Sequence, residues 1–249
     1  MNVLILAAGY ATRLYPLTLN KAKPLLVVGS KPIIEWLVDN LSGIPDLETI
    51  YIVTNDKFAA DFQTWSESYQ KRHPSFKFKI ISDGSTSDDD KLGAIGDINF
   101  VVTHENLSES NLLIAAGDNL FTNSLADFVA NARNTEVTVA VYDVGDTEAI
   151  KKYGNVTVNA EGTITRFEEK PKKPQGTLAA IALYYYSPAV LSLLTTYLTT
   201  GNNADQPGRF VQWLYTRKPV KTFQIKGQWL DIGSKETLQN ADRILGSAR

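Results

Sequence analysis

A short N-terminal stretch combines small residues with fixed positive charge, the residue types that hold phosphate groups. Residues 5–26, ILAAGYATRLYPLTLNKAKPLL, place Ala7, Ala8 and Gly9 after an apolar run and then supply Arg13 and Lys23. Small residues let a ligand approach the backbone, and consecutive N–H groups in such a turn form an anion-binding concavity. Arginine adds a rigid charged fork and lysine a mobile point charge. The stretch therefore indicates a triphosphate site.

On the glycine pattern alone, a second interpretation stays open: an ordinary strand-to-helix connection with two solvated cations. Pro16 and Pro24 interrupt the segment, so we expect a long loop rather than a helix opened by a glycine motif. The stretch matches neither the dinucleotide fingerprint GxGxxG nor the P-loop GxxxxGK[ST]. A phosphate site of another type is therefore the functional hypothesis.

A carboxylate follows a second apolar run. Residues 111–121, NLLIAAGDNLF, indicate a buried strand that ends in small residues and places Asp118 at its carboxyl end. Open α/β sheets bind their ligands at that end of their strands. Taken alone, Asp118 and Asn119 are also consistent with a simple turn.

Two further charged clusters have plain explanations when they are taken alone. Asp88, Asp89 and Asp90 are typical of a solvated charge run in a polar loop. Glu168, Glu169 and Lys170, which precede Pro171, are equally typical of a solvated surface.

The elements that would position these residues alternate between strand and helix. Strands are expected at residues 3–6, 49–54 and 76–82, and helices over residues 33–43 and 57–72. This alternation predicts a parallel sheet covered by helices, with an α/β fold. From Tyr153 onward two alternating runs around Asn159 to Gly162 indicate a β-hairpin, and LAAIALYYY over residues 178–186 indicates another strand. Helices are expected near residues 125–132, 188–198 and 209–215 and after Ser234.

Composition limits the function classes. The 249 residues, 43% hydrophobic and 21% charged, suit one globular domain over residues 1–249. A formal charge of −2 argues against a dedicated nucleic-acid binder. The absence of cysteine excludes disulfides, thiolate metal sites and a cysteine nucleophile. No run approaches the ~20 apolar residues that span a bilayer, so we expect a cytoplasmic protein without a membrane partner.

Residues 3–32 resemble the N-terminal signature of the sugar-1-phosphate nucleotidylyltransferases, the glucose-1-phosphate thymidylyltransferase group in particular. The family pattern is close to LAxGxGTRLxPxTxxxxKxLLPVxxKP, and this chain has LAAGYATRLYPLTLNKAKPLLVVGSKP. The matching residues, in order, are Gly9, Thr12, Arg13, Leu14, Pro16, Thr18, Lys23, Lys31 and Pro32. Ala11 stands where the family loop has a glycine. The resemblance implies a single-domain Rossmann-like nucleotidyltransferase fold, with a mixed, mainly parallel central sheet flanked by helices and a small β-hairpin subregion.

The same resemblance assigns roles across the chain. It implies that residues 1–120 form a nucleotide-binding half, with contacts from Ala8, Gly9, Thr12, Arg13, Lys23, Gly93 in LGAIGD, and Asp118. It implies that residues 121–249 form a sugar-phosphate-binding half, with Gly154, Glu169, Lys170 and Tyr184. An arginine precedes a glycine in the family's next segment, whereas this chain has Pro207 before Gly208, and we take Arg209 as the replacement. GDN and WLDIG match the family's metal-binding segments, so Asp118 and Asp231 are the expected metal ligands.

The function expected from this resemblance is nucleotidyl transfer from a nucleoside triphosphate, dTTP or UTP favoured, to a sugar-1-phosphate, with Mg²⁺ as cofactor. Arg13, Lys23 and Lys170 would be the catalytic cations. Because Asp118 and Asp231 both follow strands, we expect them at the same sheet edge. Two alternative functions are a nucleotide-sugar-dependent glycosyltransferase and a non-catalytic ligand sensor. A glycosyltransferase would be expected to have a DxD pair where this chain has GDN. The oligomeric state is open, with a homo-oligomer among the alternatives.

Overall fold

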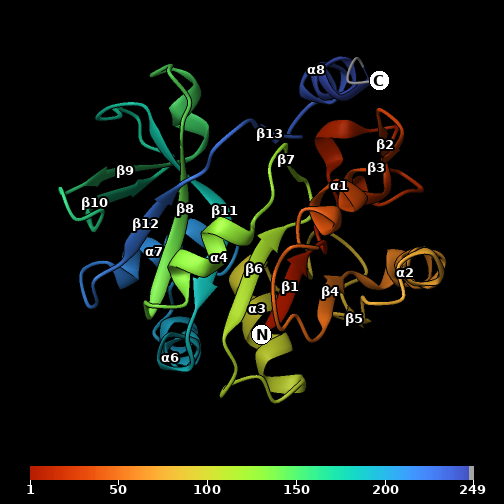
Figure 1. Cartoon of the computed structure of the whole chain (residues 1–249), viewed down its shortest axis with the longest axis horizontal. Coiled ribbons are helices and arrows are strands. Elements are labelled where there is room, and N and C mark those ends of the chain that lie inside the picture. Colours follow the sequence, from red (N-terminus) through yellow and green to blue (C-terminus); the bar gives the residue numbers. More distant parts are fainter. Residues whose placement is uncertain (247–249) are drawn as a thin grey trace. The chain divides into compact units, whose positions relative to one another are not determined.

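The chain folds into two units, each assembled from separated stretches of sequence (Figure 1). The structure, a computed structural model, describes residues 1–246. Unit 1 contains Met1–Leu92, Ala115–Ala126 and the segment that begins at Gly227, whereas unit 2 contains Gly93–Ile114 and Asp127–Lys226. Strand β6, Leu112–Ala116, and helix α4, Ala126–Ala132, cross this division along the chain.

Parallel strands form the centre of unit 1. Strand β4, Ile50–Thr54, pairs on one side with β1, Asn2–Leu6, and on the other with β5, Phe78–Ser82. All five residues of β4 are buried, which explains why this strand is a continuous run of β-branched and aromatic residues. Because β1, β4 and β5 are parallel, their carboxyl ends lie at the same edge of the sheet. The residues after Leu6 and Thr54 therefore share that edge.

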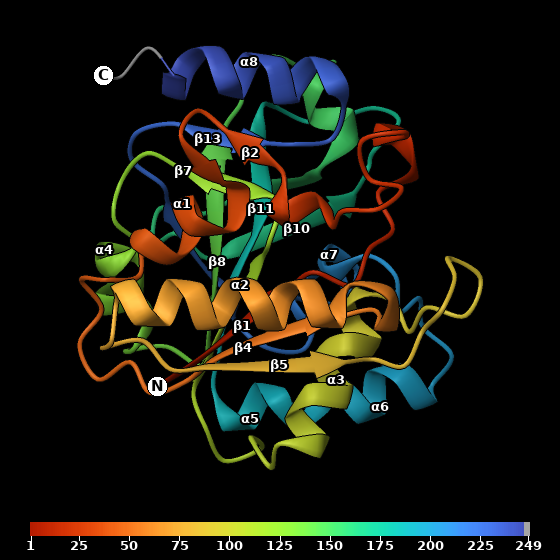
Figure 2. The ribbon, with the colours of Figure 1, turned by 90° about the vertical axis from the view of Figure 1, so that its right-hand side faces the viewer.

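Helix α2, Ala59–Arg72, covers β5 through an aromatic face. Phe62, Trp65 and Tyr69 are buried at helical spacing. The ring centroids of Trp65 and Tyr69 lie 5.4 and 5.7 Å from that of Phe78, in edge-on geometry. Figure 2 shows α2 lying along this part of the sheet. The predicted strand–helix–strand pattern of residues 49–82 is confirmed.

Two small ladders and the last helix make a second core in unit 1. The ladders pair β2, Val27–Val28, with β3, Lys31–Pro32, and β7, Asn119–Phe121, with β13, Trp229–Asp231. Helix α8, Lys235–Gly246, and helix α1, Ile33–Asp39, pack against them. Their shared core consists of Val28, Ile33, Leu120, Ile232 and Ala241. The Ser234 hydroxyl accepts a hydrogen bond from the Thr237 N–H at 3.2 Å, which confirms the predicted helix start.

Unit 2 contains a mixed group of strands. Strand β11, Leu178–Tyr186, runs antiparallel to β8, Val137–Asp143, and to β9, Gly154–Val158. Strand β10, Ile164–Glu169, returns from β9 as the predicted hairpin. Strand β12, Lys221–Gln224, adds to β8 in parallel and was not predicted, because KTFQ is short and half polar.

Of the α-helices in residues 1–246, five lie wholly or largely in unit 2. Helix α3, Ala94–His104, precedes β6, and α5, Pro188–Leu191, α6, Leu193–Thr199, and α7, Pro207–Leu214, follow β11. Phe210 of α7 stacks on Trp213 and meets Tyr186 and Tyr197 edge-on. Among the described residues, no helix is both long enough and apolar enough to cross a bilayer.

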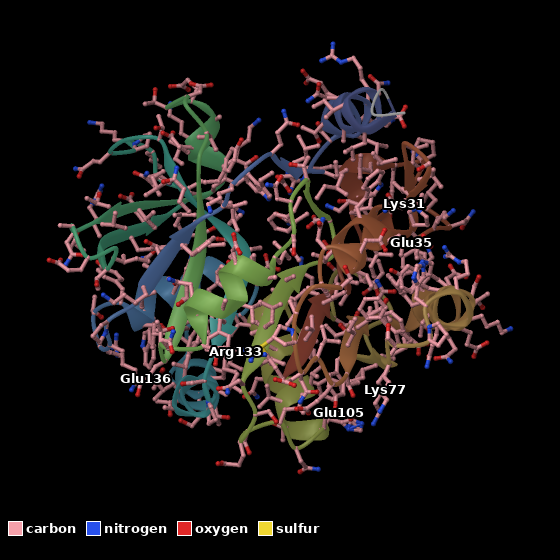
Figure 3. All side chains as sticks on the ribbon, in the orientation of Figure 1. Lys31, Glu35, Lys77, Glu105, Arg133 and Glu136 are labelled. Carbon is pink, nitrogen blue, oxygen red and sulfur yellow. The ribbon has the colours of Figure 1, made fainter. Side chains whose placement is uncertain are left out.

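A buried carboxylate connects α1 to α2. Glu35, labelled in Figure 3, is a buried residue of α1, and its side chain is 9% exposed. One carboxylate oxygen accepts hydrogen bonds from Trp65 Nε1 at 3.0 Å and from an Arg72 guanidinium nitrogen at 2.8 Å. The Arg72 side chain is 52% exposed, so the Trp65 N–H, which is buried, depends more strongly on Glu35.

We therefore expect Glu35→Leu to lower the free energy of unfolding by about 1–3 kcal/mol, because the buried Trp65 donor loses its acceptor. Glu35→Gln should cost less, since the amide oxygen still accepts from Trp65 and the arginine can turn to water. Urea unfolding measures both changes, with Glu67→Gln on the exposed face of α2 as the control. Equal losses for the leucine and glutamine variants would contradict this account.

Candidate active site

Hydrogen bonds within unit 1 fix the start of the loop after β1. The Ala7 N–H donates to the Val53 carbonyl at 2.8 Å, and buried Asn55 donates from Nδ2 to the Ala8 carbonyl at 2.9 Å. At Gly9 the backbone φ is not positive, and an added Cβ would meet no atom within 4 Å. Neither backbone strain nor packing within the described residues requires glycine there, so the open space beside Gly9 is available to a ligand.

The following turn carries the predicted cations. Ala11 adopts a left-handed conformation with φ of 50°, and its carbonyl accepts hydrogen bonds from Leu14 N–H and Thr18 Oγ1, both at 2.9 Å. The turn therefore keeps a positive φ although the residue is not glycine. Thr12 and Arg13 begin a 3₁₀ helix, Thr12–Leu14, and both are exposed.

Lys23 brings together three distant segments of unit 1. Its ammonium donates to a carboxylate oxygen of Asp118 and, at 2.9 Å, to the carbonyl of Ile232. A Cβ added at Gly117 would lie only 3.1 Å from the Leu6 carbonyl oxygen and 3.1 Å from Pro24 Cγ. Glycine at 117 thus lets the chain pass close to β1 and places Asp118 beside Lys23.

Of the two predicted metal carboxylates, Asp231 belongs to the β7–β13 ladder and Asp118 directly precedes that ladder. In the β7–β13 ladder Asp231 lies opposite Asn119, and the Ile232 N–H donates to the Asp118 carbonyl at 3.3 Å. The expectation that both aspartates reach one edge of the central sheet is corrected: a separate two-stranded ladder brings them close. Asp231 is the last residue of its strand, and Asp118 lies between β6 and β7.

This pair has the donor chemistry of a magnesium site. Mg²⁺ takes one or two carboxylates and completes its coordination with water and phosphate oxygens. Among residues 1–246 no group of three or more histidine, cysteine, aspartate or glutamate side chains is arranged to hold a metal. Asp118 and Asp231 lie close along the backbone, and their side chains are of the donor type that suits a cation also bound by phosphate oxygens.

The predicted sugar-phosphate residues gather around Glu169 in unit 2. Glu169 lies opposite Gly154 in the β9–β10 hairpin. A Cβ added at Gly208 would lie 1.9 Å from Glu169 Oε2, and one added at Gly154 would lie 3.1 Å from the same oxygen. The two glycines therefore make the space that the carboxylate fills.

Charges around Glu169 act in opposite directions. Burial raises the pKa of the Glu169 carboxyl, whereas the nearby charges of Lys170 and Arg209 lower the pKa. Lys170 has a left-handed φ of 49°, and its N–H donates to the Tyr153 carbonyl at 3.0 Å. Arg209 donates from Nε to Gln206 Oε1 at 3.3 Å. Both cations thus surround one partly desolvated carboxylate.

Tyr184 is part of the core next to this carboxylate. It is 3% exposed, and its ring stacks on Tyr186 with centroids 5.8 Å apart. Burial raises the pKa of its hydroxyl well above the ordinary value, and the charge of Glu169 adds to the shift. The hydroxyl therefore stays protonated and is a potential hydrogen-bond donor.

Gly93 has a structural role within unit 2. Its φ is 79°, and an added Cβ would lie 2.7 Å from the Ala204 carbonyl oxygen. The Ile95 N–H donates to that oxygen at 2.8 Å. Packing therefore accounts for this glycine, and its contact with a nucleobase stays a prediction.

The acidic loop is more ordered than a solvated charge run. The Asp90 carboxylate accepts hydrogen bonds from the N–H groups and hydroxyls of Thr86 and Ser87. These bonds lower its pKa to about 2. Asp88 pairs with Lys91 at 3.1 Å. Asp90 thus closes a turn, which the charge pattern alone does not indicate.

Sequence reasoning did not assign three polar residues that hold these sites. Asn55 fixes the loop after β1, Asn119 donates to Asp118 at 2.9 Å, and Gln212 accepts from the Glu169 N–H at 2.9 Å. Of the three, only Asn119 was marked by its position in the sequence, because it directly follows the candidate metal ligand Asp118. The other two become recognisable only when the fold brings them to their partners.

The chain matches a protein-family model and is similar to several known proteins. A family model described as nucleotidyl transferase matches residues 2–247. The bifunctional protein GlmU of Methanocaldococcus jannaschii is 25% identical over 98% of this chain and 54% of its own length. The UTP–glucose-1-phosphate uridylyltransferase AglF of Haloferax volcanii is 25% identical over 98% of this chain and 96% of its own length. The chain spans about half the length of the GlmU relatives.

Other relatives, 24 to 28% identical, are named for guanyl, adenylyl and thymidylyl transfer. Among solved structures, a UDP-glucose pyrophosphorylase complexed with UDP-glucose matches 100% of this chain and 99% of its own, with a TM-score of 0.82 and 22% identity. This likeness confirms the predicted α/β nucleotidyltransferase fold, with its mixed, mainly parallel sheet flanked by helices. Because the family model matches nearly all its residues, this chain belongs to the nucleotidyl transferase family.

Proposed function

We propose that this chain transfers a nucleotidyl group from a nucleoside triphosphate, dTTP or UTP, to a sugar-1-phosphate and releases pyrophosphate, with Mg²⁺ as cofactor. The observation that carries the proposal is the contact of Lys23 with Asp118 and with the carbonyl of Ile232, the residue that follows Asp231 in unit 1. A lysine beside Asp118, with Asp231 near along the backbone, suits a substrate that carries phosphate and a metal ion together.

Unit 1 would hold the triphosphate. The space beside Gly9 lets phosphate oxygens approach the N–H groups from Ala8 to Thr12. Exposed Arg13 would neutralise charge on the leaving pyrophosphate, and Lys23 would contact the triphosphate. To do so, Lys23 must exchange part of its contact with Asp118 for phosphate oxygens, so its present ion pair keeps the side chain in place until a substrate arrives.

Asp118 and Asp231 would hold the magnesium ion. Both oxygens of Asp118 accept a hydrogen bond, from Asn119 and from Lys23, and each retains a further lone pair. When bound, Mg²⁺ supplies positive charge against the negative charge of the phosphates.

Unit 2 would hold the sugar-1-phosphate. Glu169 would accept hydrogen bonds from sugar hydroxyls, beside Gly154 and Tyr184, and Lys170 and Arg209 would hold the phosphate. The ionised phosphate is itself the nucleophile, so no protein nucleophile is needed. Its oxygen forms a bond to the α-phosphorus while the bond to the pyrophosphate oxygen breaks, and the protein contributes positioning and charge neutralisation.

The choice of base is the finer part of the proposal. dTTP or UTP is proposed from the overall resemblance, and Gly93 is the proposed backbone contact to the base. The relatives' names include four different nucleotides, so the nucleotide must be measured.

The first prediction is pyrophosphate release that needs both substrates. The full chain is incubated with Mg²⁺, each of the common ribonucleoside triphosphates or dTTP, and a panel of sugar-1-phosphates. We expect release only when a sugar-1-phosphate is present, and most with dTTP or UTP. Release from the triphosphate in water alone would indicate a hydrolase, and preference for a purine nucleotide would contradict the proposed base.

A second prediction concerns the two aspartates. Asp118→Asn and Asp231→Asn should each lower turnover by roughly 10²–10³-fold, the scale of losing one preorganised electrostatic contact. The double variant should lose less than the product of both, because either change disables the same ion. Turnover is measured across a Mg²⁺ titration, with exposed Asp61→Asn as the control. Wild-type turnover in either single variant at limiting Mg²⁺ would remove that residue from the metal site.

The third prediction follows from the raised pKa of Glu169. Because the folded protein holds this proton more tightly than the unfolded chain, the contribution of Glu169 to stability falls as pH rises from the ordinary value of 4.5 to the folded pKa. Glu169→Gln removes the ionisation, so the variant should gain stability relative to wild type across this interval and reach a plateau above it. Urea unfolding at a series of pH values measures the difference, with Glu168→Gln as the control. A difference that does not change with pH would refute the assignment.

A further inference from the structure

The Asp118 carboxylate is held by a hydrogen-bonded relay of two buried side chains. Trp229 donates its indole N–H to Asn119 Oδ1, and Asn119 donates from Nδ2 to Asp118 Oδ1 at 2.9 Å. Trp229 is 8% exposed and Asn119 3% exposed. Both belong to the β7–β13 ladder, in which Trp229 lies opposite Phe121 and Asp231 opposite Asn119.

The chemistry of these groups determines the direction of the relay. An indole N–H can only donate, so the group of Asn119 that faces Trp229 must be its carbonyl oxygen. The amide NH₂ is then left for Asp118, which accepts it. Replacing the indole by an apolar ring would remove the donor to Asn119 Oδ1, which is what orients the Asn119 NH₂ towards Asp118.

The other oxygen of Asp118 faces positive charge. Lys23 donates to Asp118 Oδ2 and also to the Ile232 carbonyl, one residue after Asp231. Asn119 on one oxygen and an ammonium on the other therefore determine how the carboxylate is turned. A cation is already stabilised on the side of Asp118 that Asn119 leaves open.

We propose that Asn119 is a positioning residue, oriented by Trp229, that turns the Asp118 carboxylate so that Oδ2 receives a divalent cation. This inference rests on the proposed metal role of Asp118. Hydrogen-bond partners of metal ligands typically contribute 10–100-fold to metal affinity. A purely structural role is the competing explanation, because the Trp229–Asn119 bond also satisfies two buried polar groups in the ladder.

The test separates stability from metal affinity. Asn119→Leu, Trp229→Phe and the double variant are prepared in the full chain. Urea unfolding measures stability, and electron paramagnetic resonance of free Mn²⁺ measures metal binding without nucleotide. Asn119→Leu should weaken Mn²⁺ binding roughly 10–100-fold and lower stability, because the buried Trp229 donor loses its acceptor. Trp229→Phe should weaken binding less, since the amide can still reach Asp118.

The double variant gives the decisive comparison. It contains neither the buried donor nor its acceptor, so its loss of stability should be smaller than the sum of the two single losses. Its Mn²⁺ affinity should remain as low as that of Asn119→Leu, because the donor to Asp118 is still missing. If Asn119→Leu does not fold alone, the double variant still provides this measurement. Asn240→Leu, the same change at an exposed site of α8, should leave Mn²⁺ binding unchanged.

Two results would overturn the positioning role while leaving the metal site in place. The first is Mn²⁺ affinity that recovers together with stability in the double variant. The second is unchanged Mn²⁺ affinity in Asn119→Leu. No Mn²⁺ binding by the wild-type chain would overturn the proposed metal role of Asp118 and this inference with it. These two failures are distinguished by the wild-type titration alone.

Discussion

The contact of Lys23 with Asp118 and the Ile232 carbonyl is the interaction on which unit 1 depends. It joins three segments that are far apart in sequence, and its two side chains are only 17% and 24% exposed. A partly shielded charge is less stable without its partner, so replacing either group alone should lower the free energy of unfolding. Ile232 is also part of the core shared by α1, α8 and the β7 strand. Ile232 therefore links the packing of α8, through its side chain, to the position of Lys23, through its carbonyl.

Unit 2 also contains a partly buried carboxylate near positive charge, that of Glu169. Its carboxylate fills the space that Gly154 and Gly208 leave, and Lys170 and Arg209 oppose the effect of burial on its pKa. The Glu169 N–H is fixed by Gln212, so the turn that presents Glu169 and Lys170 is anchored to α7. Each unit thus keeps a carboxylate beside a cation in a partly dry setting, where electrostatic interactions are stronger than in water.

The glycines of the family pattern serve distinct physical needs. Gly93 and Gly117 permit close backbone approach within their own units, and Gly208 gives room to a carboxylate. Gly9 differs, because no described atom would meet its Cβ. The open space beside Gly9 therefore leaves room for a ligand to approach the backbone. Ala11 shows the converse, since it adopts a positive φ without being glycine.

The sequence by itself determined the alternation of strands and helices, the hairpin around Asn159 to Gly162, the start of the last helix after Ser234 and the residue types of the site, because these depend on local periodicity, turn chemistry and motif order. It did not indicate β12, the Asp90 turn or the partners Asn55 and Gln212. It also placed Asp118 and Asp231 at one sheet edge, whereas the β7–β13 ladder brings them together. Such contacts depend on strand pairing and side-chain packing between segments distant in the chain, which only the tertiary structure decides.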